Sequence, residues 1–305
     1  MAARASKLEA AALIGAAALC VAIFFALTTT TDPPRLDERT PAAAHRIVSL
    51  VPALTEMLFA VGAGAQVVGV SSYDDFPDDV RSRPRVGALL DPDVERILSL
   101  RPDLVLVYGS QSDLEGQFGR AGIRVYPYRH GGIANVLATI RDMGMLSGHA
   151  GEGERLAADL QRDLDATRAR VAGRDRPKTM VIMGRDAGTL RGVYASAGVG
   201  FLHELIDIAG GEDAFADVAR EGVQPSNETM LTRAPGVIIE LHAGEEPARD
   251  VVRRERAVWS LLASLPAVRS DRVYLLYGRY LMSPGPRLAR AADAMARVLH
   301  PEAYP

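Results

Sequence analysis

The sequence predicts an α/β fold made of two doubly wound lobes joined by a single long helix. Short apolar segments alternate with amphipathic ones on both sides of the chain's midpoint, which is typical of parallel strands covered by helices. Between them, leucine and valine recur at helical spacing from Glu152 to Gly173. Two passages, residues 91–107 and 224–240, also share one pattern of proline, glutamate and leucine. We therefore expect two lobes of similar architecture.

The first lobe, residues 46–132, begins the alternation. Strands are expected at residues 46–51, 66–70, 103–107 and 123–128, and helices at residues 52–61, 94–100 and 112–121. In sheets of this kind, ligands bind beyond the carboxyl ends of the strands. The loops of interest are therefore those that hold Ser49, Tyr73, residues 108–111 and residues 128–130.

The segment from residue 133 to 176 is predicted to be helical and to bridge the lobes. A first helix starts at Ile133, a glycine-broken joint follows at residues 147–151, and a second helix runs from about Glu152 to Gly173. At 1.5 Å per residue, the second helix would be roughly 33 Å long. Gly173 and the proline that follows it at position 177 are typical of a helix end.

The second lobe, residues 177–305, resumes the alternation. Strands are expected at residues 179–183, 190–194, 237–241 and 273–276, and helices at residues 201–209, 228–233, 249–262 and 287–299. Trp259 lies in one of these helices and is expected in the core. Four residue pairs separated by 133 positions relate this lobe to the first: Pro92 and Pro225, Glu95 and Glu228, Leu98 and Leu231, and Pro102 and Pro235.

The N-terminal residues 1–31 are predicted to be an export signal or a membrane anchor. Arg4 and Lys7 precede an uncharged apolar run from Ala10 to Leu27, which fits both a signal peptide and a short membrane span. No A-x-A cleavage site follows the run, so both alternatives stay open. Residues 32–45 are rich in proline, alanine and charge and are predicted to form a linker.

Composition and motifs argue against several function classes. A formal net charge of −3 does not suit a nucleic-acid-binding protein, and the histidines lack metal-ligand spacing. No P-loop is present, the glycines at residues 62 and 64 fall at a helix end, and residues 194–198 lack the first glycine of a nucleophile elbow. We therefore expect no catalysis, and an α/β enzyme is the remote alternative.

Two stretches carry a resemblance to a known family. Residues 46–77 and 92–107, together with Ala209–Gly211 and the repeat at residues 225–240, are similar to periplasmic binding proteins that serve importers of cobalamin, iron siderophores and haem. The resemblance extends from Arg46 to about Pro301. It implies a monomer that binds a bulky ligand in a cleft between its lobes. It also implies a location in the periplasm, free or tethered to the inner membrane, and an ABC permease with a cytoplasmic ATPase as partner.

The resemblance also implies a docking role for two glutamates. In that family, one glutamate on each lobe docks onto arginines of the permease, and the matching positions are Glu95 and Glu228. Two carboxylates on equivalent exposed helix starts would fix the orientation of the protein on a basic partner. The alternative is that each glutamate only stabilises the start of its helix.

Within the family, the resemblance is closest to the cobalamin-binding members. It implies that Tyr73, Tyr108, Tyr194 and either Arg279 or Tyr280 contact a corrinoid, which would be the transported ligand and not a resident cofactor. Flat aromatic side chains suit such a macrocycle because they bury much area at a small entropy cost. Two positions that carry tryptophan in those members fall near Leu89 and Gly222, a departure that leaves other large ligands open.

Two other ligands remain alternatives. Haem needs an axial tyrosine or histidine, for which Tyr108 and His130 are candidates. A ferric siderophore would favour several arginines near the ligand, and the candidates are Arg129, Arg185, Arg191 and Arg279.

Overall fold

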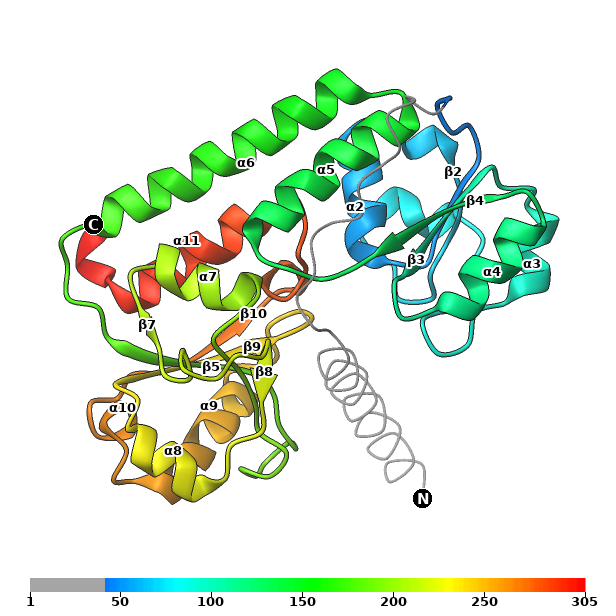
Figure 1. Ribbon diagram of the computed structural model, residues 1–305. Coiled ribbons are helices and arrows are strands. Elements are labelled where there is room, and N and C mark those ends of the chain that lie inside the picture. The colour runs from blue at the N-terminus through cyan, green and yellow to red at the C-terminus, as the bar shows by residue number, and fades with distance from the viewer. Residues whose placement is uncertain (1–41, 305) are drawn as a thin grey trace, which may run out of the picture. The chain divides into compact units, whose positions relative to one another are not determined.

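The computed structural model describes residues 42–304, which form two compact units (Figure 1). The first unit contains residues 42–163 and Ser283–Arg287, and the second contains residues 164–282 and 288–304. Each unit has an α/β fold with its own sheet. The predicted signal or anchor at residues 1–31 lies outside the described residues. No helix among residues 42–304 combines the length and the apolar character needed to cross a membrane.

The sheet of the first unit is entirely parallel, as predicted. Its strands, in spatial order, are β2 (Val67–Val70), β1 (Ile47–Ser49), β3 (Leu104–Tyr108) and β4 (Arg124–Tyr128). All four carboxyl ends therefore lie along the same edge, where the loops with Tyr73, Tyr108 and Tyr128 begin. This edge is where ligands of parallel sheets bind.

Helices cover both faces of the first sheet. The helical elements are α2 (Pro52–Ala60), α3 (Val94–Ser99), α4 (Ser112–Arg120), α5 (Ile133–Ser147) and the 3₁₀ turns η1 (Gly64–Gln66) and η2 (Asp78–Ser82). Figure 1 shows α2 and α5 on one face, and α3 and α4 on the other. Alternate strand residues, such as Val105 and Val107 of β3, pack against Ile97 of α3 and Phe118 of α4. This two-residue period follows from the pleat of the strand.

The predicted long helix is α6 (Ala150–Val171), which has 22 residues and includes the boundary between the two units at Asp163 and Leu164. It follows α5 through a joint at Gly148, whose φ of 81° is left-handed and favours glycine. Close contact between α5 and α6 depends on two further glycines. A Cβ at Gly144 would lie 2.9 Å from the Cα of Gly153, so a side chain there would force the helices apart.

The sheet of the second unit is mixed. Its strands, in spatial order, are β10 (Val273–Tyr277), β9 (Val237–His242), β5 (Lys178–Gly184), β6 (Tyr194–Ser196) and β8 (Gly222–Val223), and β7 (Glu212–Asp213) pairs with β5. β6 is antiparallel to both β5 and β8. The strand predicted at residues 190–194 is wrong, because the chain turns back at Gly188 and Gly192, which have positive φ, and pairs only from Tyr194.

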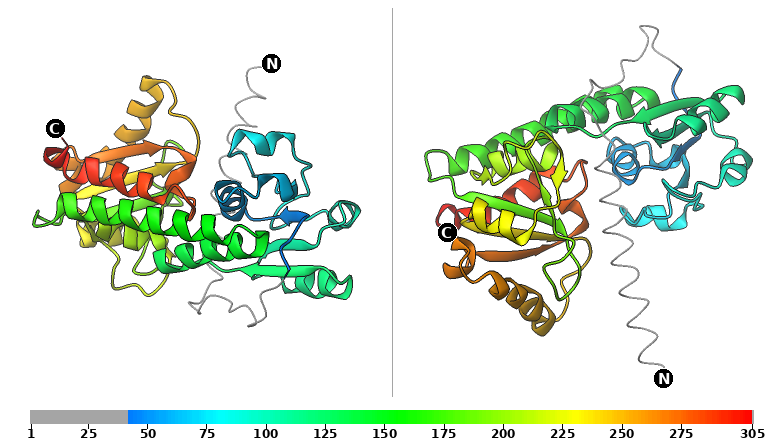
Figure 2. Two further views of the ribbon diagram at one scale, coloured as in Figure 1. Left: turned by 90° about the horizontal axis from the view of Figure 1, so that it is seen from above. Right: turned by 60° about the horizontal axis from the view of Figure 1, so that its bottom comes forward.

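Helices also cover both faces of the second sheet. They are α7 (Phe201–Ile208), α8 (Asn227–Arg233), α9 (Arg249–Ala257), α10 (Pro266–Arg269), α11 (Leu288–Leu299) and the 3₁₀ turns η3 (Val258–Leu262), η4 (Arg279–Leu281) and η5 (Pro301–Ala303). Figure 1 shows α7 and α11 on one face and α8, α9 and α10 on the other. Figure 2 shows α11 alongside the end of α6, where Arg170 and Asp293 form an ion pair at 3.5 Å.

The helix predicted at residues 249–262 changes pitch after Ala257 and continues as η3. The change accompanies the burial of Trp259, which lies in the core of the second unit with Met180, Ile182 and Ile238. The expectation that Trp259 is a core residue is therefore confirmed.

Ser283–Arg287 belongs to the first unit although it comes late in the chain. Arg287 binds both carboxylate oxygens of Glu56 in α2, at 2.6 and 2.9 Å, and its guanidinium lies 3.9 Å from the ring centroid of Phe76. Burial raises the pKa of Glu56, and the hydrogen bond and charge of Arg287 offset part of that shift. No sequence pattern indicated this segment's place in the first unit.

Candidate functional site

The loop after β2 presents the most exposed aromatic side chain of the predicted site. Tyr73 is 59% exposed, although it lies in a loop with a fixed backbone. Its N–H donates to Oγ of Ser71 at 3.0 Å, and the guanidinium of Arg85 donates to the carbonyl oxygens of Ser71 and Asp74 at 2.9 and 2.5 Å. These hydrogen bonds therefore fix the backbone around Tyr73 at the carboxyl edge of the first sheet.

Beneath this loop, Asp74 is only 3% exposed. Burial raises the pKa of its carboxyl group to about 7, and interactions with Thr55, Ser71 and Arg85 offset only part of the effect. Asp74 also faces Glu56 and Tyr108 closely enough that its charge and theirs influence one another. The first unit therefore holds a carboxyl group at this edge that changes charge near neutral pH.

Tyr108 belongs to a cluster of three rings at the ends of β3 and β4. It pairs in register with Tyr128, and their ring centroids are 6.4 Å apart. The ring of His130 lies 5.0 Å from that of Tyr128 and 6.3 Å from that of Tyr108, and the Tyr128 hydroxyl approaches His130 Nδ1 at 3.4 Å. The register of adjacent parallel strands is the signal that could have predicted this cluster, because both strands end in tyrosine.

Burial sets the protonation of this cluster. It lowers the pKa of His130 to about 3, so the imidazole is neutral at physiological pH. Burial, together with the nearby Asp74, raises the pKa of Tyr108 above its usual range. A neutral imidazole between two phenols can accept a hydrogen bond or donate a lone pair to a metal centre.

Tyr194, at the start of β6, is only 8% exposed and packs against Gly222 of β8. A Cβ at Gly222 would lie 2.5 Å from Cζ and Oη of the tyrosine. The ring of Tyr194 therefore fills the space that any side chain at position 222 would need. Burial and the neighbouring Glu221 raise the pKa of Tyr194 to about 12, so its hydroxyl stays protonated.

Arg279 and Tyr280 lie in η4, directly after the end of β10. Arg279 is exposed, whereas Tyr280 is half-buried and the guanidinium of Arg290 lies 4.1 Å from its ring centroid. One face of the Tyr280 ring is thus already in contact with a cation. The other predicted residue of the second unit, Tyr194, comes from a different element, β6.

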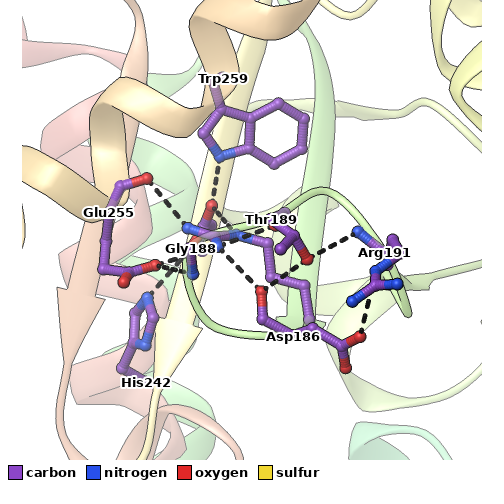
Figure 3. Close-up of polar contacts among 9 residues, drawn as sticks. Asp186, Gly188, Thr189, Arg191, His242, Glu255 and Trp259 are labelled. Carbon is purple, nitrogen blue, oxygen red and sulfur yellow. Dashed lines mark hydrogen bonds and ion pairs between the residues drawn. The ribbon is translucent and has the colours of Figure 1, made fainter.

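Arg185, a candidate for binding anionic ligands, is instead part of a buried network at the ends of β5 and β9. Its Nε donates to Glu240 at 2.9 Å, its Nη1 pairs with Glu255 at 3.0 Å, and it also donates to the carbonyl oxygens of Thr189 and Glu255. Figure 3 shows Glu255, Thr189 and Trp259 converging on this network. The guanidinium is therefore occupied within the second unit.

Glu240 is the acceptor at the centre of that network. It accepts hydrogen bonds from Arg185 and from Nε1 of Trp259, and it pairs with His242 at 3.1 Å. Burial alone would raise the pKa of Glu240, but the hydrogen bonds and the charge of Arg185 leave it below its usual value. The ring of His242 in turn stacks on Tyr277 with centroids 4.8 Å apart.

The two predicted docking glutamates occupy equivalent places in α3 and α8. Glu95 and Glu228 are exposed in the first turns, and neither carboxylate forms a hydrogen bond or ion pair with another residue of the part of the chain that the structure describes. Other residues cap these helices: Asp93 accepts from Arg96 N at 2.9 Å, and Ser226 accepts from Thr229 N at 3.1 Å. The caps are also 133 positions apart, so the repeat includes them.

Comparisons with known proteins agree on a single family. The model of the periplasmic binding protein family matches residues 47–280. The vitamin B12-binding protein of Yersinia pestis (strain Pestoides F) is 29% identical over 199 residues, which cover 65% of this chain and 69% of that protein.

Solved structures give the same result. The periplasmic vitamin B12 binding protein of Vibrio cholerae aligns with a TM-score of 0.73 at 24% identity, covering 87% of this chain and all of that one. A periplasmic haem-binding protein of Roseiflexus sp. RS-1, in its apo form, aligns with a TM-score of 0.71 at 26% identity, covering 86% of this chain and all of that one. The first of these likenesses shows the fold alone.

Replacement of Asp74 tests the buried carboxyl group. Because the pKa of Asp74 is about 7 in the folded chain and about 3.9 for aspartate in an unfolded chain, the folded state holds an extra proton between these pH values, and the wild type loses stability as pH rises through them. Asp74→Asn should therefore be more stable than wild type by about 2 to 4 kcal/mol at pH 8, with little difference at pH 4. Urea unfolding at both pH values measures this. The exposed Asp79→Asn is the control, and equal effects of the two variants would contradict the burial argument.

Replacement of Gly222 tests its contact with Tyr194. Gly222→Ala should lower the free energy of unfolding by about 1 to 3 kcal/mol, because the new methyl group displaces the tyrosine ring. Gly236→Ala is the control, since a Cβ there would meet only Lys178 O at 3.7 Å. In a Tyr194→Ala background, the Gly222→Ala change should cost almost nothing. An undiminished cost in that background would show that the two residues do not share the space.

Proposed function

The chain belongs to the periplasmic binding protein family, and we propose that it captures a cobalamin-like corrinoid and delivers it to an ABC permease of the inner membrane. Proteins of this family bind and carry a substrate for an importer and are not enzymes. The family also implies that the protein works in the periplasm. We keep the proposal that residues 1–31 direct export or tether the protein to the membrane.

The exposed ring of Tyr73, on a loop with a hydrogen-bonded backbone, is the observation that carries the corrinoid proposal. A flat macrocycle offers a large face to an aromatic side chain, and a loop with an ordered backbone loses little entropy on binding. Phe76, three residues after Tyr73, is also exposed, but Arg287 covers one face of its ring. The sequence similarity to vitamin B12-binding proteins supports the same ligand class.

The arginines favour a corrinoid over an anionic siderophore. Arg185 is fully engaged with Glu240, Glu255 and backbone carbonyls. Arg191 is exposed and faces Asp186 at 3.9 Å. Two of the four arginines that could neutralise a ferric siderophore therefore already have carboxylate partners.

Haem is the second candidate, and the cluster of Tyr108, Tyr128 and His130 favours it. A neutral imidazole beside two phenols offers the two kinds of axial ligand that haem iron takes from such side chains. The similarity to the haem-binding protein of Roseiflexus supports this alternative. The corrinoid stays the first proposal because Tyr73, and not this cluster, is the side chain most exposed to a ligand.

Titration of the full chain separates the candidates. We expect saturable, one-to-one binding of cyanocobalamin by calorimetry, weakened about tenfold by Tyr73→Ala and almost unchanged by Tyr73→Phe, because the loss is that of one stacking contact. Hemin and ferric enterobactin, an anionic siderophore complex, titrated in parallel, should bind more weakly. If hemin alone binds tightly and His130→Ala removes its Soret shift, the corrinoid proposal is wrong and the haem alternative replaces it.

We also propose that Glu95 and Glu228 dock on basic residues of the permease. The support is their equivalent exposed position, and the fact that Asp93 and Ser226 already provide the helix caps. The positive partial charge at the N-terminus of each helix also stabilises an acidic side chain there. The glutamates therefore do not destabilise the fold in the absence of the permease.

Charge reversal tests the docking proposal. Glu95→Lys combined with Glu228→Lys should abolish uptake in cells where this chain replaces the native copy, because two attractive contacts become repulsive. Ligand affinity measured by titration should stay within about twofold of wild type. Asp113→Lys with Asp250→Lys, which reverses first-turn acids of α4 and α9, is the matched control. Normal uptake by the glutamate variant would return both residues to a role in helix stability.

A further inference from the structure

Two exposed leucines lie beside the proposed docking glutamates. Among the described residues, the exposed large apolar side chains are Tyr73, Phe76, Leu90, Leu98, Leu231 and Leu261. Leu98 and Leu231 are each 39% exposed, and each follows a docking glutamate by three positions in α3 or α8. They are separated by the same 133 positions as the rest of the repeat. Single exposed leucines are ordinary, but matched exposure at equivalent positions of two units is not.

The orientation of the two helices explains how each leucine is exposed. Ile97 in α3 and Met230 in α8 are fully buried and are the residues that anchor their helices in the cores. Both helices therefore turn the same side inward. The leucine directly after each buried anchor is therefore exposed to solvent. So is the glutamate that lies two residues before the anchor.

We propose that Leu98 and Leu231 form the apolar part of the permease-docking surface, one beside each glutamate. The proposal rests on the docking role of Glu95 and Glu228. On a helix, side chains at positions i and i+3 are neighbours, about 5–6 Å apart at Cβ, so each unit presents one carboxylate and one apolar side chain together. The occupant that fits is a permease surface with a basic side chain next to an apolar hollow at each of two places.

The physical reason for this pairing is the weakness of an exposed ion pair. A carboxylate that stays in water gains little from a cation, because solvent and salt screen the attraction. An apolar contact next to the pair excludes water from it, which is how the centre of a protein interface gains strength from few residues. The glutamates would then orient the protein on the permease, and the leucines would prolong the contact.

Alanine replacement tests the leucines in the full chain in living cells. Leu98→Ala with Leu231→Ala should lower the initial rate of uptake about tenfold per folded binding protein, because apolar area is lost at both contacts. The probe is radiolabelled cyanocobalamin, or hemin if the titration selects it. Leu98→Met with Leu231→Met keeps the apolar surface and should transport at the wild-type rate. Leu90→Ala with Leu261→Ala is the matched control, since both leucines are exposed, at 66% and 71%, but lie outside the repeat.

The amount of folded protein in each strain is measured by its ligand-binding capacity, and the uptake rate is divided by that amount. A variant that folds poorly is therefore distinguished from one that docks poorly. A lower rate in the alanine pair, with normal rates in the methionine and control pairs, supports the proposal. Unchanged uptake by the alanine pair, when the Glu95→Lys and Glu228→Lys variant is inactive, overturns the role of the leucines and leaves the docking proposal standing. Unchanged uptake by both variants overturns docking itself.

Discussion

Register between parallel strands is the constraint on which the candidate site depends. In the first unit, hydrogen bonding between β3 and β4 places Tyr108 opposite Tyr128, so two separate loops begin at the same place. The parallel pairing of β1 with β2 brings the loop of Tyr73 to that same edge. A slip of one residue would turn these side chains to the other face of the sheet. The site is therefore a consequence of backbone pairing before any side chain interacts.

Each unit uses an arginine to bind backbone carbonyl oxygens beside its own sheet. Arg85 donates to carbonyl oxygens of the loop after β2, and Arg185 donates to those of Thr189 and Glu255. The second arginine is also neutralised by Glu240 and is fully buried with it. A buried ion pair of this kind contributes little net stability, but removal of one partner would leave an uncompensated buried charge. In both units the cation therefore binds groups of the protein itself.

The periodic parts of the fold could be predicted from the sequence. The helix predicted at residues 152–173 is found at Ala150–Val171, and all four strands of the first sheet are present, because each depends on its own run of apolar residues. The short strands β7 and β8 were not predicted, since two residues carry no periodicity and form only when a distant partner is in place. The direction of β6 depends in the same way on contacts remote in sequence.

For the candidate site, the sequence predicted where several residues lie along the chain better than what their side chains contact. Tyr108 ends β3 as predicted and Tyr73 lies in the loop after β2, but Tyr194 begins β6 instead of ending a strand. The sequence also could not show that Tyr194 is buried over Gly222 or that a cation covers Tyr280. It also could not show that Arg185 forms ion pairs with two carboxylates, because these partners lie in β9 and α9, far along the chain. Whether these residues contact a ligand stays a prediction.

The contact between Arg287 and Glu56 has a consequence for how the protein is made. Although the repeat suggests that one half of the chain copies the other, the first unit is not complete until a residue near the C-terminus arrives. During synthesis, Glu56 has no ion pair with Arg287 until more than two hundred further residues have emerged from the ribosome. The first unit therefore cannot be excised as residues 42–163 alone without losing the partner of a buried carboxylate.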